Sequence, residues 1–323
     1  MGCCQTTPEQ HHVTIEVDRY EKPERFESRP PENVRVVKVH AVQHDIQTSY
    51  PNPGPQSRQR AVFPPLEKFP QVKETYEYLG PYQYEQRGAF IGPFLLENGA
   101  IYEGEWQGNK RHGQGKQMWE DGSLYEGTWA NDKANGHGRL IHADGDVYEG
   151  WWVDDKAHGR GRYIHLDGAI YEGEWRDDKQ HGHGVETWPD NARYEGDYLD
   201  GRKHGRGVFT WADGSRYEGE FYQNNIHGRG IYEWADGRKY QGEWKDNKME
   251  GEGSFSWPDG RVYQGEYHDD KKHGYGVFIW PDGKKYEGYW ENGKQHGEGT
   301  FTDANGQPRR GEWVDGKRTR WLE

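Results

Sequence analysis

The sequence has little cysteine and few aliphatic residues, and both shortages narrow what the chain can be. Its only cysteines are Cys3 and Cys4 among 323 residues. Adjacent cysteines make a strained disulfide, and two thiols do not complete a zinc site, so neither a disulfide framework nor a structural metal is expected. Hydrophobic residues make up 31% of the chain, too few for two thick globular cores. The sequence therefore predicts a thin structure.

Two further absences concern membranes and nucleic acids. No apolar run reaches the roughly 18 residues that a membrane-spanning helix needs, and residues 1–20 lack the apolar core of a secretory signal. The formal net charge is -13, whereas nucleic-acid binding requires clustered Lys and Arg. We therefore expect neither a transmembrane helix nor a nucleic-acid partner.

Composition changes near residue 80. Residues 1–79 hold ten of the sixteen prolines, two glycines and no tryptophan. They carry 10 Lys and Arg against 11 Asp and Glu, which leaves 32 against 44 for the rest of the chain. This composition predicts a mostly disordered tether, with an extended linker around Pro53. Within it, Val34 to Val42 alternates enough to form a strand, which we expect to pair with the sheet's first edge near Phe94.

The rest of the chain is repetitive. Residues 102–308 form nine units of 23 residues, each numbered here from its tyrosine, from Tyr102 to Tyr286. Positions 3, 12 and 14 are always glycine, position 5 is always aromatic, and position 18 is tryptophan in six units. Self-similarity at a fixed period of this length is typical of solenoids and related repeat folds.

The alternation of residue types at odd and even positions within each unit predicts the fold class. Positions 1, 3 and 5 read tyrosine, glycine, aromatic, and positions 2 and 4 are mostly glutamate, as in Glu103 and Glu105. Such period-two alternation predicts strands with one apolar and one solvated face. Positions 12 to 18 repeat this pattern in a second strand. We therefore predict an all-β, single-layer antiparallel meander of hairpin repeats, in which glycine leaves room for neighbouring rings.

Two turns must connect these strands. Positions 20 and 21 are Asp-Gly in seven units, which predicts a two-residue type I′ turn with positive φ at both residues. Repeat four has Asn191 where the others have glycine. Among residues other than glycine, asparagine is the one that best tolerates positive φ. Positions 6 to 11 predict a longer polar turn.

The pattern YEGEWxxxKxHGxG, as in Tyr171 to Gly184, resembles the MORN (membrane occupation and recognition nexus) repeat. The resemblance covers residues 102–308, with a partial unit at 80–101 marked by Gly92, Phe94 and Gly99, and another at 309–323. Arg309 replaces the first tyrosine of a tenth unit. The resemblance implies a repeat scaffold, a membrane-junction protein or a module beside an enzyme.

The first six residues carry a second motif. Met1-Gly2-Cys3-Cys4-Gln5-Thr6 fits the N-myristoylation pattern, with two cysteines beside the glycine for palmitoylation. One myristoyl chain anchors only marginally, and the first cation is Arg19, so palmitate on Cys3, Cys4 or both is the expected second signal. The alternative is a coincidental match with unmodified cysteines.

Other candidate sites favour structural roles. Histidine occupies position 11 in seven units, but units about 9–10 Å apart are too far for shared metal coordination. The repeated Asp-Gly is read as turn chemistry rather than calcium binding, and the glutamates as a solvated face. No phosphate loop, nucleophile elbow or kinase signature is present. We therefore expect no catalytic residue, cofactor or metal.

The aromatic face is the predicted binding surface, since one sheet layer cannot cover its own apolar face completely. The alternative is that its rings are simply the core. Its tryptophans are Trp106, Trp129, Trp152, Trp175, Trp188, Trp211, Trp234, Trp244, Trp257, Trp280 and Trp290.

Together these features predict a non-catalytic scaffold on the cytoplasmic face of a membrane, such as the plasma membrane, the cell cortex or a cilium. The repeats would bind protein partners, cytoskeletal ones included, or a second copy of the chain. Phosphoinositide head groups are an alternative ligand, disfavoured by the acidic charge of the repeats. A docking role for a separate kinase or phosphatase is the third alternative.

Overall fold

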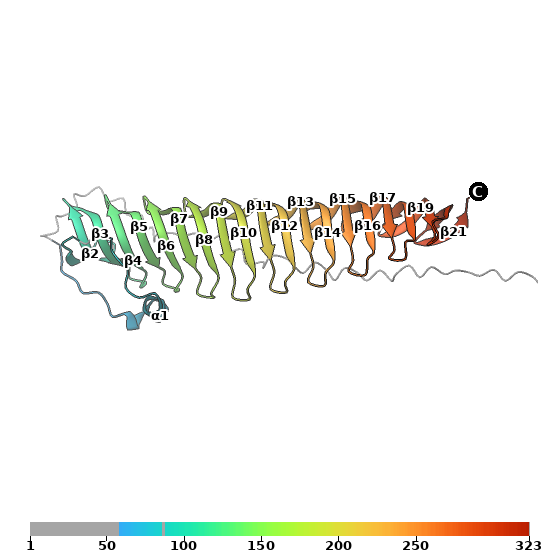
Figure 1. Cartoon of the computed structure of the whole chain (residues 1–323). Helices are drawn as coiled ribbons and strands as arrows, with labels where there is room; N and C mark the ends of the chain where they lie inside the picture. The colour runs from blue at the N-terminus through green and yellow to red at the C-terminus, as the bar shows by residue number, and fades with distance from the viewer. Residues whose placement is uncertain (1–57, 86–87, 323) are drawn as a thin grey trace, which may run out of the picture. The chain divides into compact units, whose positions relative to one another are not determined.

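The computed structural model describes residues 58–85 and 88–322. These residues divide into two compact units, an N-terminal unit that reaches Lys248 and a C-terminal unit that begins at Met249. Inside each unit, every strand pairs antiparallel with the next strand along the chain (Figure 1). The predicted fold class, an antiparallel meander of hairpins, is confirmed.

The N-terminal unit begins with a 3-10 helix η2 (Leu66–Lys68) and the α-helix α1 (Pro70–Leu79). Its strands are β1 (Ile91–Leu95), β2 (Ile101–Gln107), β3 (Lys110–Met118), β4 (Leu124–Ala130), β5 (Lys133–Ile141), β6 (Val147–Val153), β7 (Lys156–Ile164), β8 (Ile170–Arg176), β9 (Lys179–Thr187), β10 (Arg193–Leu199), β11 (Arg202–Thr210), β12 (Arg216–Tyr222), β13 (Asn225–Glu233) and β14 (Lys239–Lys245). The C-terminal unit consists of β15 (Lys248–Ser256), β16 (Val262–His268), β17 (Lys271–Ile279), β18 (Lys285–Glu291), β19 (Lys294–Thr302), β20 (Pro308–Val314) and β21 (Lys317–Trp321).

Each sheet has an aromatic face, formed by positions 1, 3, 5, 14 and 16, and an outer face, formed by positions 2, 4, 13, 15, 17 and 23. On the aromatic face, the position-1 tyrosine ring lies on the glycines at positions 3 and 14 of its own unit, as Tyr102, Tyr217 and Tyr286 do. A methyl group added at Gly115 would lie 2.3 Å from the Tyr102 hydroxyl oxygen, and one at Gly138 would lie 2.3 Å from that of Tyr125. The expectation that glycine leaves room for rings is confirmed at these positions.

Neighbouring repeats share their rings. Tyr102 meets Trp106 of its own repeat edge to face at 5.1 Å, and it meets Trp129 of the next repeat at 5.4 Å. The Tyr102 hydroxyl donates to the Glu105 carbonyl, and the Trp129 indole donates to the Gly115 carbonyl at 3.3 Å. Because rings alternate along the sheet in this way, the core is a row of aromatic side chains, whose polar atoms bind backbone carbonyls at positions such as Tyr102 and Trp129.

The tight turn is not where Asp-Gly predicted it. Positions 7 and 8 form the two-residue turn, as at Asn131 and Asp132, where φ is 52° and 71°. The Asp-Gly sequence lies in a five-residue loop, in which Gly122 has positive φ and closes the loop onto Trp119. The interpretation of Asn191 is confirmed, since its φ is 69°.

A side-chain bond explains why aspartate and asparagine accept the left-handed conformation in the tight turn. The Asp155 carboxylate accepts the Ala134 backbone N–H at 2.7 Å, and the Asp155 N–H donates back to the Ala134 carbonyl at 3.0 Å. The same pair of bonds joins Asp178 to Ala157. The turn residue of one repeat therefore binds the strand of the preceding repeat, which offsets its backbone strain.

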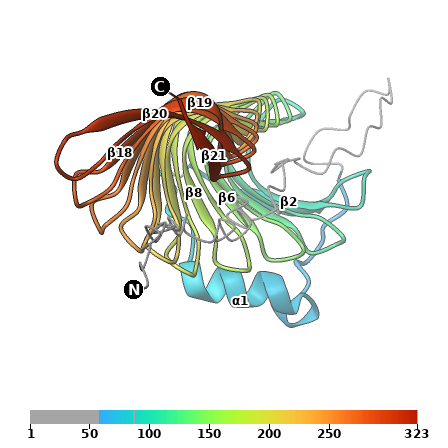
Figure 2. The ribbon, with the colours of Figure 1, turned by 90° about the vertical axis from the view of Figure 1, so that its right-hand side faces the viewer.

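The helix α1 corrects the predicted boundary of the tether. Composition predicted that residues 1–79 are mostly disordered, but the structure is described from residue 58 and holds a helix at Pro70–Leu79. Figure 2 shows α1 lying outside the sheet rather than within it. We expected Val34–Val42 to pair with the sheet near Phe94, but that segment lies outside the described residues. In the structure, Arg60 pairs with Phe94 through an isolated antiparallel bridge.

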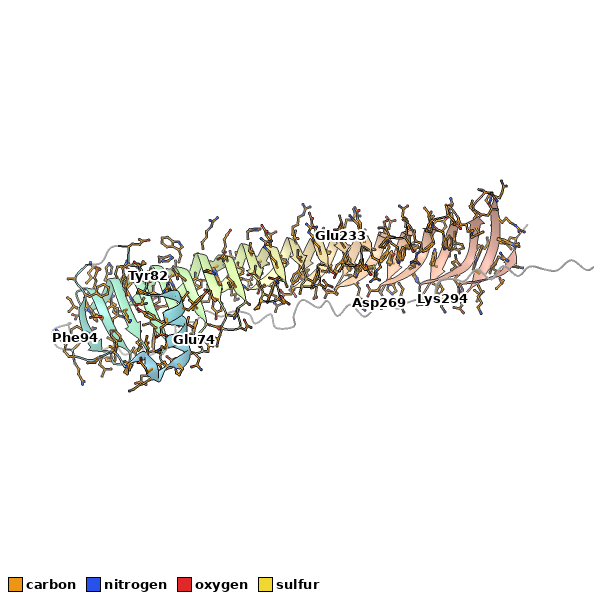
Figure 3. All side chains as sticks on the ribbon, turned by 60° about the horizontal axis from the view of Figure 1, so that its bottom comes forward. Glu74, Tyr82, Phe94, Glu233, Asp269 and Lys294 are labelled. Carbon is orange, nitrogen blue, oxygen red and sulfur yellow. The ribbon has the colours of Figure 1, made fainter. Side chains whose placement is uncertain are left out.

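Both partial repeats keep the register. Phe94 pairs with Tyr102 in β1 and β2, as a position-16 residue pairs with the tyrosine of the next unit, and Figure 3 labels it at the first strand. At the other end, β20 and β21 extend the sheet beyond Arg309. Among the described residues, no helix is long and apolar enough to cross a membrane.

The ring-on-glycine contact predicts a large effect of one methyl group. Gly115→Ala should lower the free energy of unfolding by about 1–3 kcal/mol, because the methyl group overlaps the Tyr102 ring. Urea denaturation of the full chain measures this. Gly214→Asn is the control, since nothing lies within 4 Å of its added carbon and repeat four carries Asn191 at the same position. Equal destabilisation by both would contradict the ring-on-glycine explanation.

Candidate interaction surfaces

The predicted acylation site, Gly2 with Cys3 and Cys4, lies outside the residues that the structure describes. It therefore stays a prediction from the sequence motif. The surfaces that can be built residue by residue are the two faces of the sheets.

The tryptophans of the aromatic face fall into two classes. The position-5 rings of five repeats are buried, with exposed fractions between 1% and 6%: Trp129, Trp152, Trp175, Trp244 and Trp290. The remaining six are half-buried: Trp106, Trp188, Trp211, Trp234, Trp257 and Trp280. A partner on this face would therefore meet mainly the position-18 row, at the entrance to the Asp-Gly loops.

Half-buried tryptophans pack on the next repeat rather than standing free. Trp211 lies 5.0 Å from the Tyr232 ring, and Trp188 lies 5.5 Å from the Phe209 ring. The Trp211 indole nitrogen is buried without a hydrogen-bond partner among the described residues. These half-buried rings are the partly accessible part of the predicted binding face.

A buried lysine interrupts the aromatic row at repeat five. The Lys203 ammonium lies 2.7 Å from the Glu186 carboxylate, with 1% and 15% of the two side chains exposed. It also lies 5.0 Å from the centres of the Trp188 and Tyr194 rings. Burial raises the pKa of Tyr198, whose hydroxyl donates to Glu186. Glu186 thus balances a charge that the rings alone would leave uncompensated.

The position-11 histidines lie near the start of the second strand of their repeats, as His112 does in β3 and His181 in β9. His112 and His181 each have a buried ring nitrogen without a hydrogen-bond partner among the described residues. In residues 58–85 and 88–322, no three His, Cys, Asp or Glu side chains are grouped to hold a metal ion. The geometry therefore gives these histidines no shared ligand.

The outer face is charged, and many of its charges are paired. In the first three repeats position 15 of one strand meets position 2 of the next, as Arg139 meets Glu149 at 2.8 Å and Arg162 meets Glu172 at 3.0 Å. In later repeats the position-2 glutamate pairs within its own strand, as Glu195 does with Arg193. The glutamates at position 2 therefore belong to a solvated, ion-paired face. Single pairs of this kind contribute about 0–1 kcal/mol where they are exposed.

Two places on the outer face depart from this pattern. In the C-terminal unit, Tyr275 and Tyr289 form an exposed cross-strand pair with ring centres 5.6 Å apart, near exposed Ile279. In the N-terminal unit, α1 covers an apolar cluster that includes Leu124 and Val147. Sequence reasoning missed both places. The sequence signal was an apolar residue at position 17, as Ile279, or at position 23, as Leu124 and Val147.

Comparison with known proteins identifies the repeats. The family model of the MORN repeat matches residues 102–124, 125–147, 148–169, 171–193, 194–216, 217–237, 240–260, 263–285 and 286–307. No curated protein matches the chain significantly.

Solved structures give weaker likenesses. The TCP10 domain of Danio rerio CPAP is 16% identical over 64% of this chain and 99% of that one, with a TM-score of 0.35. The TCP domain of Drosophila melanogaster SAS-4, in complex with a proline-rich motif of Ana2, is 12% identical over 59% and 99%, with a TM-score of 0.31. These scores support no inference about fold or function.

The buried ion pair of Lys203 and Glu186 predicts a large loss of stability that a second substitution reverses. Lys203→Ile should destabilise the fold by about 3–5 kcal/mol, because it leaves Glu186 charged and unpaired. The double variant Lys203→Ile/Glu186→Phe should regain most of that loss, since the next repeat carries Phe209 and Ile226 at these positions. Thermal and urea unfolding of both variants check this. A double variant no more stable than the single one would rule the explanation out.

Proposed function

The chain belongs to the MORN-repeat family, and from this premise we propose that it is a non-catalytic scaffold tethered to the cytoplasmic face of a membrane. Myristoyl and palmitoyl groups on Gly2 and on Cys3 or Cys4 would form the tether, and the repeats would bind protein partners. The observation that carries the scaffold role is the array itself. Nine hairpins present the same kind of surface again and again, and such repeated surfaces are used for binding.

The non-catalytic part of the proposal is supported by the structural roles of the residues that recur along the repeats. The tyrosines, glycines and position-5 rings pack on one another, and several position-2 glutamates pair with Lys or Arg of the same or the neighbouring strand. The turn aspartates bind backbone N–H groups. Each of these recurring groups therefore has a structural task, and none converges on a reacting centre.

Charge supports assigning membrane attachment to the acyl groups instead of the repeats. Residues 80–323 carry 32 Lys and Arg against 44 Asp and Glu, so an anionic lipid surface repels the array as a whole. One myristoyl chain gives marginal binding, and a second chain makes anchoring stable. Outer-face cations such as Arg139 and Arg162 are paired with glutamates, which also speaks against the phosphoinositide alternative.

Fractionation of cells that express full-length variants tests the anchor. Gly2→Ala should move the protein from the membrane to the soluble fraction, because neither myristoylation nor the palmitoylation that follows it can occur. Cys3→Ser/Cys4→Ser should leave weak, salt-insensitive and reversible binding through myristate alone. Gln5→Ala, which keeps the motif, is the matched control. Gly2→Ala that stays fully membrane-bound would refute the anchor and point to the repeats.

A further inference from the structure

The outer face of the first repeats carries an apolar stripe formed by Met118, Leu124, Ile141, Val147 and Ile164. These residues are cross-strand partners of one another at positions 17 and 23, so they lie on one face of β3 to β7. The first four are at most 3% exposed.

Other repeats keep the same fold with polar residues at these two positions. They are Thr187, Arg193, Thr210, Arg216, Glu233 and Lys239. Hydrophobicity at positions 17 and 23 is therefore not required to build a hairpin of this array. The stripe is an addition to the first repeats, which calls for its own explanation.

Residues 63–84, named here the strap, cover the stripe. Val72 of α1 is fully buried against it, and the other apolar contacts come from the same segment: Phe63, Leu66, Phe69, Tyr76 and Leu79. From Phe69 onward these contacts recur at i, i+3, i+7 and i+10, which is the spacing of one helix face. The stripe thus receives the apolar side of an amphipathic helix.

Polar contacts fasten the strap at its end. The Thr75 hydroxyl donates to the Gly145 carbonyl at 3.0 Å, and the Arg139 guanidinium donates to the Gly80 carbonyl at 2.8 Å. Tyr82, labelled in Figure 3, shares a hydrogen bond of 2.9 Å with the His137 ring. Arg139 therefore binds a carbonyl at the C-terminal end of the helix, where a cation is favoured.

The strap is held by its apolar contacts with the stripe and by the hydrogen bonds of Thr75, Gly80 and Tyr82. It contributes no strand to the sheet beneath it, and α1 has ten residues with no side-chain cap at its N-terminus. Helices of this length are marginal alone in water, so the stripe supplies most of their stability. Beside the strap, a cleft of about 380 Å³ between Phe69, Ile101 and Met118 is left unfilled.

The strap also buries the carboxylate of Glu126, one oxygen of which is left without a hydrogen-bond partner among the described residues. Glu126 lies under the strap at 4% exposure, and the oxygen in question is its Oε2 atom. Burial raises the pKa of Glu126, whereas Lys116, at 3.5 Å, Arg139 and a backbone hydrogen bond from Tyr82 of the strap oppose that rise without cancelling it. An ionised carboxylate held in this way disfavours the closed strap. The contact therefore combines a good apolar fit with a built-in penalty.

We propose that the apolar stripe is a docking surface for an amphipathic helix of a partner protein, and that the strap occupies it until that helix displaces the strap. The inference deepens the scaffold role proposed above by naming one surface and the class of partner. The contacts of α1 define what the partner presents. It has apolar residues at i, i+3, i+7 and i+10, with an aromatic ring over Lys116 at the place of Tyr76.

The test uses full-length protein and a labelled peptide with the sequence of residues 64–84 as the probe. Val72→Asp places a charge in the buried side of α1 and should release the strap. By fluorescence anisotropy, this variant should bind the peptide at least about tenfold more tightly than the wild type, whose stripe is already occupied. Tyr78→Asp is the matched control on the exposed side of α1, and it should behave as wild type.

A second change on the stripe tests the site itself. Ile141→Thr/Val147→Lys, added to Val72→Asp, should abolish peptide binding without unfolding the array, because other repeats carry Thr187 and Lys239 at these positions. Peptide binding that survives the added changes would place the probe elsewhere and overturn the proposal. So would the absence of binding to Val72→Asp.

Hydrogen exchange on the full chains measures the strap directly. Residues 70–79 should lose protection in Val72→Asp and gain it in Glu126→Gln, which removes the buried charge. Unchanged protection in Val72→Asp would show that the strap is not released and would contradict the proposal. These assays need no membrane and no acyl group, so their failure would leave the Gly2 anchor standing, and the reverse holds as well.

Discussion

The contact between a tyrosine ring and the bare backbone of two glycines is the constraint on which this structure depends. A single sheet has no second layer to fill its apolar face, so it must cover that face with its own side chains. Tyr102 does so by lying flat over Gly104 and Gly115, while its hydroxyl reaches a backbone carbonyl. Glycine normally weakens a strand. Here its missing side chain is the space in which the core is placed.

Much of this could be derived from the sequence. Period-two alternation gave two strands per unit, and the constant glycines indicated where rings approach the backbone. What misled was the turn. Asp-Gly is a strong hairpin signal in general, but here it belongs to a five-residue loop, and pairs such as Asp154-Asp155 form the tight turn with positive φ. Their conformation is stabilised by bonds to the preceding repeat, as from Ala134 to Asp155, and no local rule contains such a contact.

The helix was missed for a related reason. Its segment is rich in proline, and its apolar residues Phe69, Val72, Tyr76 and Leu79 span too few turns to stand out. The second half of the signal lies some seventy residues away, where positions 17 and 23 are apolar in the first repeats, as at Ile141 and Val147. Each half alone reads as ordinary variation. Only the pairing of the two identifies an interface, and a single sequence does not show which distant segments pack together. The acylation motif, in contrast, consists of six consecutive residues, so it can be recognised from the sequence, and it rests on the sequence alone.

The strap also changes how the array would bear force. Tension on a sheet edge peels its strands one at a time, since each new hydrogen-bond row takes the load only after the previous row has opened. Arg60 pairs with the first strand, at Phe94, so a pull from the N-terminal side reaches the sheet at that edge. The helix α1 crosses the next strands from outside, packing on Met118, Leu124, Ile141 and Val147 at once. Several rows would then have to yield together, and the first strands of the array would be the mechanically reinforced ones.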